Sequence, residues 1–223
     1  TKTSLQWTPG AKIRDIYGHK PEAGTGHRSV GPQPYSSLKV RPEIRKIMRP
    51  QLYETSFLSM GIMAGPDLTK FLDASQGSIP GLIHAVKRFG RHVIDLILFQ
   101  HGTQLVNGTA LTARLMKSGD DLGVKYWVNS PATKLVTDAT GAVTGVVAKT
   151  PTGIHTIRAR RGVVLATGGF PQNVELRKKY FPMTPTGREH WTLAPHTADG
   201  AGLRLAESVG GYLKADLESP AAW

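Results

Sequence analysis

The chain has 223 residues, of which 39% are hydrophobic and 20% are charged, so it can bury a core in one domain or slightly more. This composition excludes an intrinsically disordered chain, and no apolar run approaches the length of about 18 residues that crosses a bilayer. The absence of cysteine excludes disulfides and thiolate nucleophiles or metal ligands. Because no secretory signal follows Thr1, we expect a cytoplasmic protein without a membrane span.

The chain carries 28 Lys and Arg residues against 16 Asp and Glu residues, and this net charge of +12 would suit a polyanion such as nucleic acid. The basic residues are scattered, however, and their densest groups lack interleaved aromatic residues that stack on bases; these groups lie at 41–49, 87–92, 158–161 and 177–179. We therefore expect a small-molecule substrate and no nucleic acid. A basic, non-enzymatic binding module is the alternative from another functional class, and the oligomeric state stays open.

Glycines and prolines crowd the first forty residues, which predicts an irregular, extended segment. The stretch 24–29 has the glycines of a phosphate loop, but Pro21 and His27 stand where the Walker pattern needs glycine and lysine. It also fails the dinucleotide pattern, because Ser29 replaces a glycine and no strand precedes it. Residues 1–79 are therefore expected to form a loop-rich insertion or cap segment.

Two amphipathic helices are predicted next. Apolar residues recur at helical spacing over 80–100, where Pro80 lies near the first turn. A second helix is expected over 109–122, with Asn107 or Thr109 capping its start and Gly123 following its last turn.

After the second helix the periodicity becomes that of strands. Turns at 138–141 and 151–153 separate short runs that predict a β-meander; the strand-like runs are 124–128, 132–136, 143–148 and 154–159. The next run, 162–166, is apolar without alternation, which predicts a strand buried on both faces of a parallel or mixed sheet.

This run ends in the pair Gly168-Gly169. Two glycines at the carboxyl end of a buried strand let the backbone approach a cofactor that a Cβ would repel, although they can also form a simple tight turn. Helices are expected afterwards over 173–180 and 200–209, the second capped by Asp199. The order of elements describes an α/β fold in which 80–170 forms the second half of a flavin-type, Rossmann-like dinucleotide-binding domain. Residues 171–223 would then lead into a substrate or cap domain.

Specific motifs add to this interpretation. The stretch 160–170 and the residues after it resemble flavoproteins of the fumarate reductase and 3-ketosteroid dehydrogenase superfamily. The steroid dehydrogenase branch fits best, because residues 26–30, the later Arg-Pro pairs and Trp223 recur there in the same order. The motif residues after 170 are Asn173, Glu175, Arg177, Tyr180, the run 197–200 and Gly210.

The resemblance implies a non-covalent FAD cofactor and an oxidoreductase acting on a CH–CH bond next to a carbonyl. A steroid-like substrate is favoured, and fumarate/succinate-type or tricarballylate-type chemistry is the alternative. In the family, Ala132 would lie on the adenosine side, and the acid of a Gly-Asp-Gly motif, here Ala198-Asp199-Gly200, would contact FAD. The cofactor-binding residues implied are Ala132, Ala166, Thr167, Gly168, Gly169, Asp199 and Gly200.

Some family features have no counterpart in this sequence. These are the amino-terminal G-x-G-x-x-G segment, which holds the pyrophosphate, and the carboxyl-terminal part that completes the flavin site. The sequence is therefore expected to be an internal fragment of a flavoenzyme that binds FAD weakly or not at all by itself and is inactive alone.

Nothing in the sequence identifies a catalytic acid or base, so the catalytic residues stay unknown. Tyrosines beside apolar neighbours are more often core residues with a satisfied hydroxyl; those considered are Tyr35, Tyr53, Tyr180 and Tyr212. His190, His196 and Asp199 could be drawn as a metal site. They lack the His-x-x-x-His spacing of a helical ligand pair, so we expect no metal.

Overall fold

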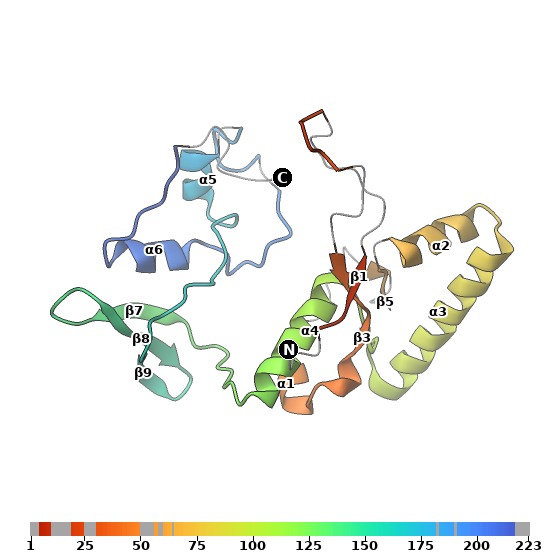
Figure 1. The fold of residues 1–223 in the computed structure, drawn as a ribbon, viewed down its shortest axis with the longest axis horizontal. Helices are drawn as coiled ribbons and strands as arrows, with labels where there is room; N and C mark the ends of the chain where they lie inside the picture. The colour runs from red at the N-terminus through yellow and green to blue at the C-terminus, as the bar shows by residue number, and fades with distance from the viewer. Residues whose placement is uncertain are drawn as a thin grey trace. The chain divides into compact units, whose positions relative to one another are not determined.

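The computed structural model describes residues 5–9, 19–24, 30–49, 56–57, 60–63, 65–181, 183–189 and 191–216. The chain divides into two compact units, Thr1–Tyr126 and Trp127–Trp223, each of which is described by itself (Figure 1). Helices and small antiparallel sheets make up the described residues, so the fold is of the mixed α/β kind. Among these residues, no helix combines the length and apolar character that a membrane crossing requires.

The first unit begins with short strands in a segment that the sequence predicts to be irregular. Strand β1 (Trp7–Pro9) pairs antiparallel with β2 (Val30–Pro32), and β3 (Tyr35–Ser36) pairs with β6 (Gln104–Leu105). The prediction is wrong at these residues, because strands of two or three residues need few backbone donors and so tolerate the nearby prolines. The motif at residues 24–29 lies outside the described residues from 25 onward.

Helices account for about half of the described residues of the first unit. The predicted helices over 80–100 and 109–122 are confirmed as α3 and α4. The elements between β3 and residue 121, other than β6, are a 3₁₀ turn η1 (Ser37–Lys39), α1 (Pro42–Ile47), the hairpin strands β4 (Ser56–Phe57) and β5 (Met60–Gly61), α2 (Pro66–Ser75), α3 (Ile79–Phe99) and α4 (Asn107–Asp121).

The ends of α4 test the predicted caps. Neither Asn107 nor Thr109 caps the helix: the residue before it is Val106, which is fully buried and offers no side-chain acceptor. The helix therefore begins without a polar side-chain cap. The other end follows the prediction, because Gly123 has a φ of +77° and its N–H donates to the Asp120 carbonyl at 2.9 Å.

Helix α3 turns its polar face inward. Its buried positions include His92 and Asp95, and the Asp95 carboxylate accepts hydrogen bonds from the Thr103 N–H at 2.9 Å and the Thr103 hydroxyl at 2.7 Å. Most of the apolar stripe that predicts the helix is exposed in this structure, and only Phe89 among its members is half-buried. The exposed members are Leu82, Val86, Val93, Leu96 and Ile97. Periodicity therefore identifies the helix but not the face that it buries.

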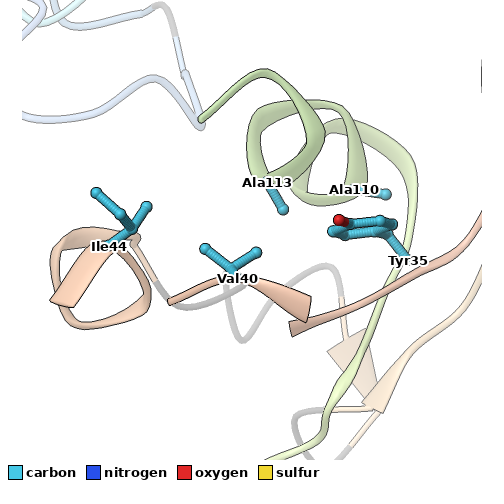
Figure 2. Close-up of a cluster of buried hydrophobic side chains, with 5 residues drawn as sticks. All are labelled: Tyr35, Val40, Ile44, Ala110 and Ala113. Atoms are coloured by element: carbon cyan, nitrogen blue, oxygen red, sulfur yellow. The ribbon is translucent and has the colours of Figure 1, made fainter. Parts of the chain in front are cut away.

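A cluster of buried apolar side chains in the first unit lies between α1 and α4 (Figure 2). Ala110 and Ala113 of α4 face Tyr35 and Val40, and Ile44 of α1 closes the cluster. The small alanines let the tyrosine ring approach the helix closely. Tyr35 is therefore a core residue, as its apolar neighbours predict, and not a candidate acid or base.

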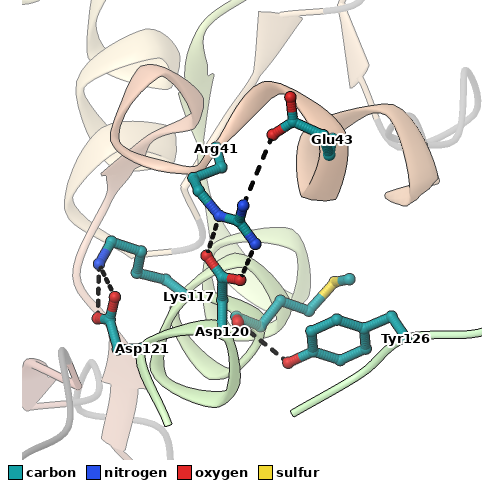
Figure 3. A network of polar contacts seen from close by, with 7 residues as sticks. Arg41, Glu43, Lys117, Asp120, Asp121 and Tyr126 are labelled. Carbon is teal, nitrogen blue, oxygen red and sulfur yellow. Dashed lines mark hydrogen bonds and ion pairs between the residues drawn. The ribbon is translucent and has the colours of Figure 1, made fainter. Parts of the chain in front are cut away.

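A polar network ties α1 to the end of α4 (Figure 3). The Arg41 guanidinium donates two hydrogen bonds to the Asp120 carboxylate, one of them from Nε at 2.6 Å. Lys117 pairs with Asp121 one turn later on the same helix at 2.5 Å, and the Tyr126 hydroxyl donates to the Met116 carbonyl at 3.0 Å. The hydrogen bonds from Arg41 hold the pKa of Asp120 below its usual value.

We expect Arg41→Met to lower the midpoint of thermal unfolding by about 2–4 °C at neutral pH. A carboxylate whose pKa is lowered by folding stabilises the protein above the unfolded-state value of about 3.9, and this stabilisation is lost as pH falls through the lower folded value. The difference between the two proteins should therefore shrink in acid. Calorimetry across this range checks the prediction, with Lys46→Met of α1 as control; a difference independent of pH would contradict it.

The second unit contains the three predicted strands of the meander. Strand β8 (Val143–Thr150) lies between β7 (Ala132–Thr137) and β9 (Gly153–Arg158), and both pairings are antiparallel. Asp138 shapes the first turn, where its carboxylate accepts from the N–H groups of Thr140 and Ala142. The prediction of a strand over 124–128 is wrong, because no strand of the described residues pairs with this segment.

The buried strand predicted over 162–166 is also wrong. The segment belongs to no strand, Val164 is 89% exposed and Leu165 is 37% exposed. A strand requires a neighbour that supplies ladder hydrogen bonds, and within the described residues no backbone group pairs with this segment. An apolar sequence alone cannot create that neighbour.

Two short helices complete the second unit, as predicted. Helix α5 (Val174–Tyr180) begins at Asn173, and α6 (Ala201–Glu207) follows Gly200, which has a φ of +86°. Leu205 is the buried apolar side chain of α6.

Candidate functional site

Most of the predicted site residues lie in two loops of the second unit. The glycine-pair loop, residues 166–170, precedes α5, and the Asp199 loop, residues 197–202, includes the first two residues of α6. Residues 166–169 are all exposed. Gly168 has a φ of +74°, and a Cβ added there would meet no atom within 4 Å, so its backbone faces open space.

Backbone hydrogen bonds join the two loops directly. The Gly200 N–H donates to the Gly169 carbonyl at 3.2 Å, and just after the glycine-pair loop the Gln172 N–H donates to the Ala198 carbonyl at 3.0 Å. Ala198 stands where the family motif has glycine, and it is buried at 8% exposure. The sequence could predict each loop from its glycines, but the contact between them is seen in the structure.

Asp199 is held from several sides. Its carboxylate accepts from the Ala201 N–H at 3.0 Å and from the Arg204 guanidinium at 3.0 Å. The predicted cap is wrong by one position, because Gly200 is the N-cap residue of α6 and no side chain caps the helix there. The Asp199 carboxylate, two residues before α6, instead binds the N–H of Ala201, the first residue of the helix. The hydrogen bond from Arg204, followed by that from the Ala201 N–H, lowers the pKa of Asp199, so the group carries a negative charge at neutral pH.

Two glycines let the loops pack together. At Gly200, an added Cβ would lie 2.8 Å from Leu176 Cδ1 and 3.2 Å from Phe170 Cβ. At Gly202, an added Cβ would overlap the Thr167 hydroxyl oxygen and lie 3.2 Å from Thr167 Cβ. The first turn of α6 can therefore approach the glycine-pair loop only because these positions carry no side chain.

Ala132 belongs to neither of these loops. It is the exposed first residue of β7, opposite Ala148 of β8. Within the described residues, no hydrogen bond or ion pair joins it to either loop. Its assignment to the adenosine side of a cofactor stays a prediction.

The structure does not bring the candidate catalytic tyrosines or the candidate metal ligands together in a site among the described residues. Tyr180 packs its ring 5.7 Å from Phe170, between ring centroids, and Tyr212 is 83% exposed. Tyr53 and His190 lie outside the described residues. Within the described part of the chain, no group of three His, Asp or Glu side chains is placed to hold a metal ion.

Sequence reasoning missed the side chain that links the loops. Asn173 accepts a hydrogen bond from the Leu176 N–H and donates another to the Asp199 carbonyl, both at 3.0 Å. Asparagine before a helical run is the expected signal for the first contact. No local signal marks the second, which joins residues 26 positions apart.

Comparison with known proteins identifies the family. The model of the FAD binding domain matches residues 27–223, which include both loops. The chain belongs to the FAD binding domain family. The cofactor of this family is FAD, as its description states, and the predicted FAD cofactor is thereby confirmed for the family to which the chain belongs.

Three proteins similar to this chain illustrate the range of enzymes in which related sequences occur. A 4-oxocyclohex-2-ene-1-carboxylate 5-dehydrogenase of Sinomonas cyclohexanicum is 33% identical, covering 100% of this chain and 37% of the relative. A urocanate reductase of Eggerthella lenta is 38% identical over 42% of this chain and 15% of its own length. The crystal structure of 3-ketosteroid delta1-dehydrogenase from Sterolibacterium denitrificans, in complex with 1,4-androstadiene-3,17-dione, matches with a TM-score of 0.78 and 27% identity, over 93% of this chain and 37% of that one. The chain therefore spans little more than a third of the length of these dehydrogenases.

Proposed function

We propose that this chain supplies part of the FAD site of an oxidoreductase that dehydrogenates a carbon–carbon bond next to a ring ketone. The single observation that carries the proposal is the family match over 27–223, a range that contains both hydrogen-bonded loops. Fumarate-type reduction is the second candidate, supported by a match to a probable fumarate reductase of Shewanella frigidimarina, which is 32% identical over 56% of this chain.

The residues of the two loops fit FAD. Ala166, Thr167 and Gly168 have exposed backbone groups for which the described residues supply no partner, and Gly168 leaves its Cβ direction open. A flat cofactor would lie against this backbone and accept hydrogen bonds from the backbone N–H groups. The Asp199 carboxylate accepts two protein hydrogen bonds and keeps acceptor capacity for a ligand hydroxyl.

The meander and the later segments fit the same proposal. Strands β7 to β9 would correspond to the three-stranded meander of a flavin-type dinucleotide-binding domain, with Ala132 at the adenosine side. Residues 171–223 would lead into the substrate domain. Support comes from the antiparallel order of these strands and from the similarity to the steroid dehydrogenase fold.

The names of two relatives suggest the substrate class. One dehydrogenates position 5 of a ring with a ketone at position 4, and the other is a delta1-dehydrogenase bound to a ring 3-ketone. Both names place a ketone in the ring that is oxidised, and we propose the same chemistry here. A ketone makes the hydrogens on its neighbouring carbon acidic, which favours removing a proton there and a hydride from the next carbon.

The chain's own residues would bind and orient the cofactor rather than react. FAD, when bound, supplies the acceptor for the hydride. The glycine-pair loop would exclude side chains from the cofactor surface, and Asp199 would orient it through a hydrogen bond. We assign the proton transfer to no described side chain, and the two loops are proposed only to bind the cofactor.

Flavin reduction by candidate substrates tests the function. The protein expressed from its whole reading frame would be purified, its FAD content measured, and the visible flavin band followed without oxygen. Bleaching by a 4-oxocyclohexene carboxylate or a 3-oxosteroid, but not by succinate, is the expected result. Bound FAD that neither ring ketone bleaches would overturn the proposed substrate class, and reoxidation of reduced enzyme by fumarate would favour the second candidate. Salt-sensitive capture on a polyanion without bound flavin would favour a non-enzymatic module.

A further inference from the structure

We propose that Asn173 is a positioning residue for FAD: its side chain fixes the spacing between the glycine-pair loop and the Asp199 loop. The inference rests on the proposed FAD site, because both loops are assigned to that site. It adds a residue that lines neither loop's open face and that would act through its neighbours.

The Asn173 side chain uses both of its polar atoms. Its Oδ1 accepts from the Leu176 N–H at 3.0 Å and so caps α5, while its Nδ2 donates to the Asp199 carbonyl at 3.0 Å. Exchanging the oxygen and nitrogen would place donor against donor and acceptor against acceptor. The two contacts therefore require one orientation of the amide.

Capping alone does not explain an asparagine at this position. Asparagine, aspartate and serine cap helices about equally well, because each presents an oxygen to the first-turn N–H groups. Only asparagine among them also carries an NH₂ group that can reach a neighbouring carbonyl. The cross-loop hydrogen bond is thus the contact that distinguishes the residue.

The acceptor of this bond is the centre of the second loop. The same Asp199 carbonyl also accepts from Arg204 Nη1 at 3.1 Å, and the Arg204 guanidinium binds the Asp199 carboxylate. Asp199 is consequently held from α5 by Asn173 and from α6 by Arg204. Its peptide cannot rotate without breaking one of these bonds, which fixes the direction of the following Gly200 N–H.

That N–H is one of the backbone bonds between the loops, since it donates to the Gly169 carbonyl. The chain of contacts therefore runs from Asn173 through the Asp199 peptide to Gly169, beside the open backbone of Gly168. Loss of the Asn173 donor should let the two loops separate. A cofactor that touches both loops would then bind more weakly, although Asn173 itself touches neither cofactor nor substrate.

Two substitutions separate capping from positioning. Asn173→Asp keeps the capping oxygen but turns a second oxygen toward the Asp199 carbonyl, and Asn173→Ser keeps the cap with a side chain too short to cross. We expect each substitution to raise the FAD dissociation constant about fivefold or more. The effect of Asn173→Asp should be the larger, because its second oxygen faces the Asp199 carbonyl oxygen. Asp138→Ala, which removes the acceptor in the β7–β8 turn, is the control; it should lower the unfolding midpoint and leave FAD affinity unchanged.

The experiment measures two quantities on the protein expressed from its whole reading frame. Flavin fluorescence quenching at a temperature where every variant is folded gives the FAD dissociation constant. Hydrogen exchange without FAD compares the Gly200 and Leu176 amides. The expected result for Asn173→Asp is faster exchange at Gly200, unchanged protection at Leu176 and weaker FAD binding.

Unchanged Gly200 exchange, or FAD affinity equal to the wild type in both variants, would overturn the inference and leave Asn173 as a helix cap. Failure of the proposed function gives a different result. A protein that binds FAD but is not reduced by ring ketones would retain the Asn173 effect on affinity. A wild type that binds no FAD would overturn both.

Discussion

Gly168→Val should lower FAD affinity about tenfold or more while the protein remains folded. The glycine has a φ of +74°, a conformation in which a β-branched residue is strained. Its Cβ direction is open in the structure, so the added side chain meets no protein atom within 4 Å. It would instead occupy the space that we assign to the cofactor, and FAD content measured against the thermal midpoint reports the difference.

The chain offers a closely matched control for this substitution. Gly153, in the turn between β8 and β9, also has a positive φ, +130°, and open space in its Cβ direction. Gly153→Val should therefore carry backbone strain, of about 1–3 kcal/mol, without a loss of FAD affinity. Equal FAD retention in both variants, or a loss that follows unfolding in both, would leave Gly168 as a structural turn.

How far the sequence predicts the fold depends on how local each determinant is. Helices α3 and α4 follow from apolar spacing within one segment, and the β7–β9 meander follows from alternation between clear turns. The segment 162–166 fails for the opposite reason. Its apolar run is compatible with a strand, but strand formation depends on a neighbour that the segment itself cannot specify.

The same distinction applies to the site. Gly168, Gly169, Asp199 and Gly200 are marked by motif and by turn chemistry, so the sequence could name them. Their proximity depends on hydrogen bonds between segments about 30 residues apart in the chain, which no local pattern encodes. Asn173 was visible as a motif residue and as a helix start, but its link between the loops was not, because the second contact lies in the other loop.

Gly202→Ala should destabilise the protein by about 1–3 kcal/mol, although alanine favours helices. The substitution lies in α6, where the added Cβ would overlap the Thr167 hydroxyl oxygen and lie 3.2 Å from Thr167 Cβ. Thr167 must rotate or the helix must move away from the glycine-pair loop. Because both responses disturb residues assigned to the cofactor, FAD affinity should fall together with the unfolding midpoint.

Two further variants identify the cause of this effect. Gly90→Ala, in the helix α3, adds a methyl group where no atom lies within 4 Å, so it should stabilise the protein by about 0.5–1 kcal/mol. Thr167→Ala removes the overlapping oxygen, and in combination with Gly202→Ala it should recover at least about 0.5 kcal/mol relative to additivity. A Gly202→Ala protein that behaves like Gly90→Ala would show that α6 does not press on Thr167. The proposed packing of the two loops would then have to be abandoned, since it requires a glycine at this point of contact.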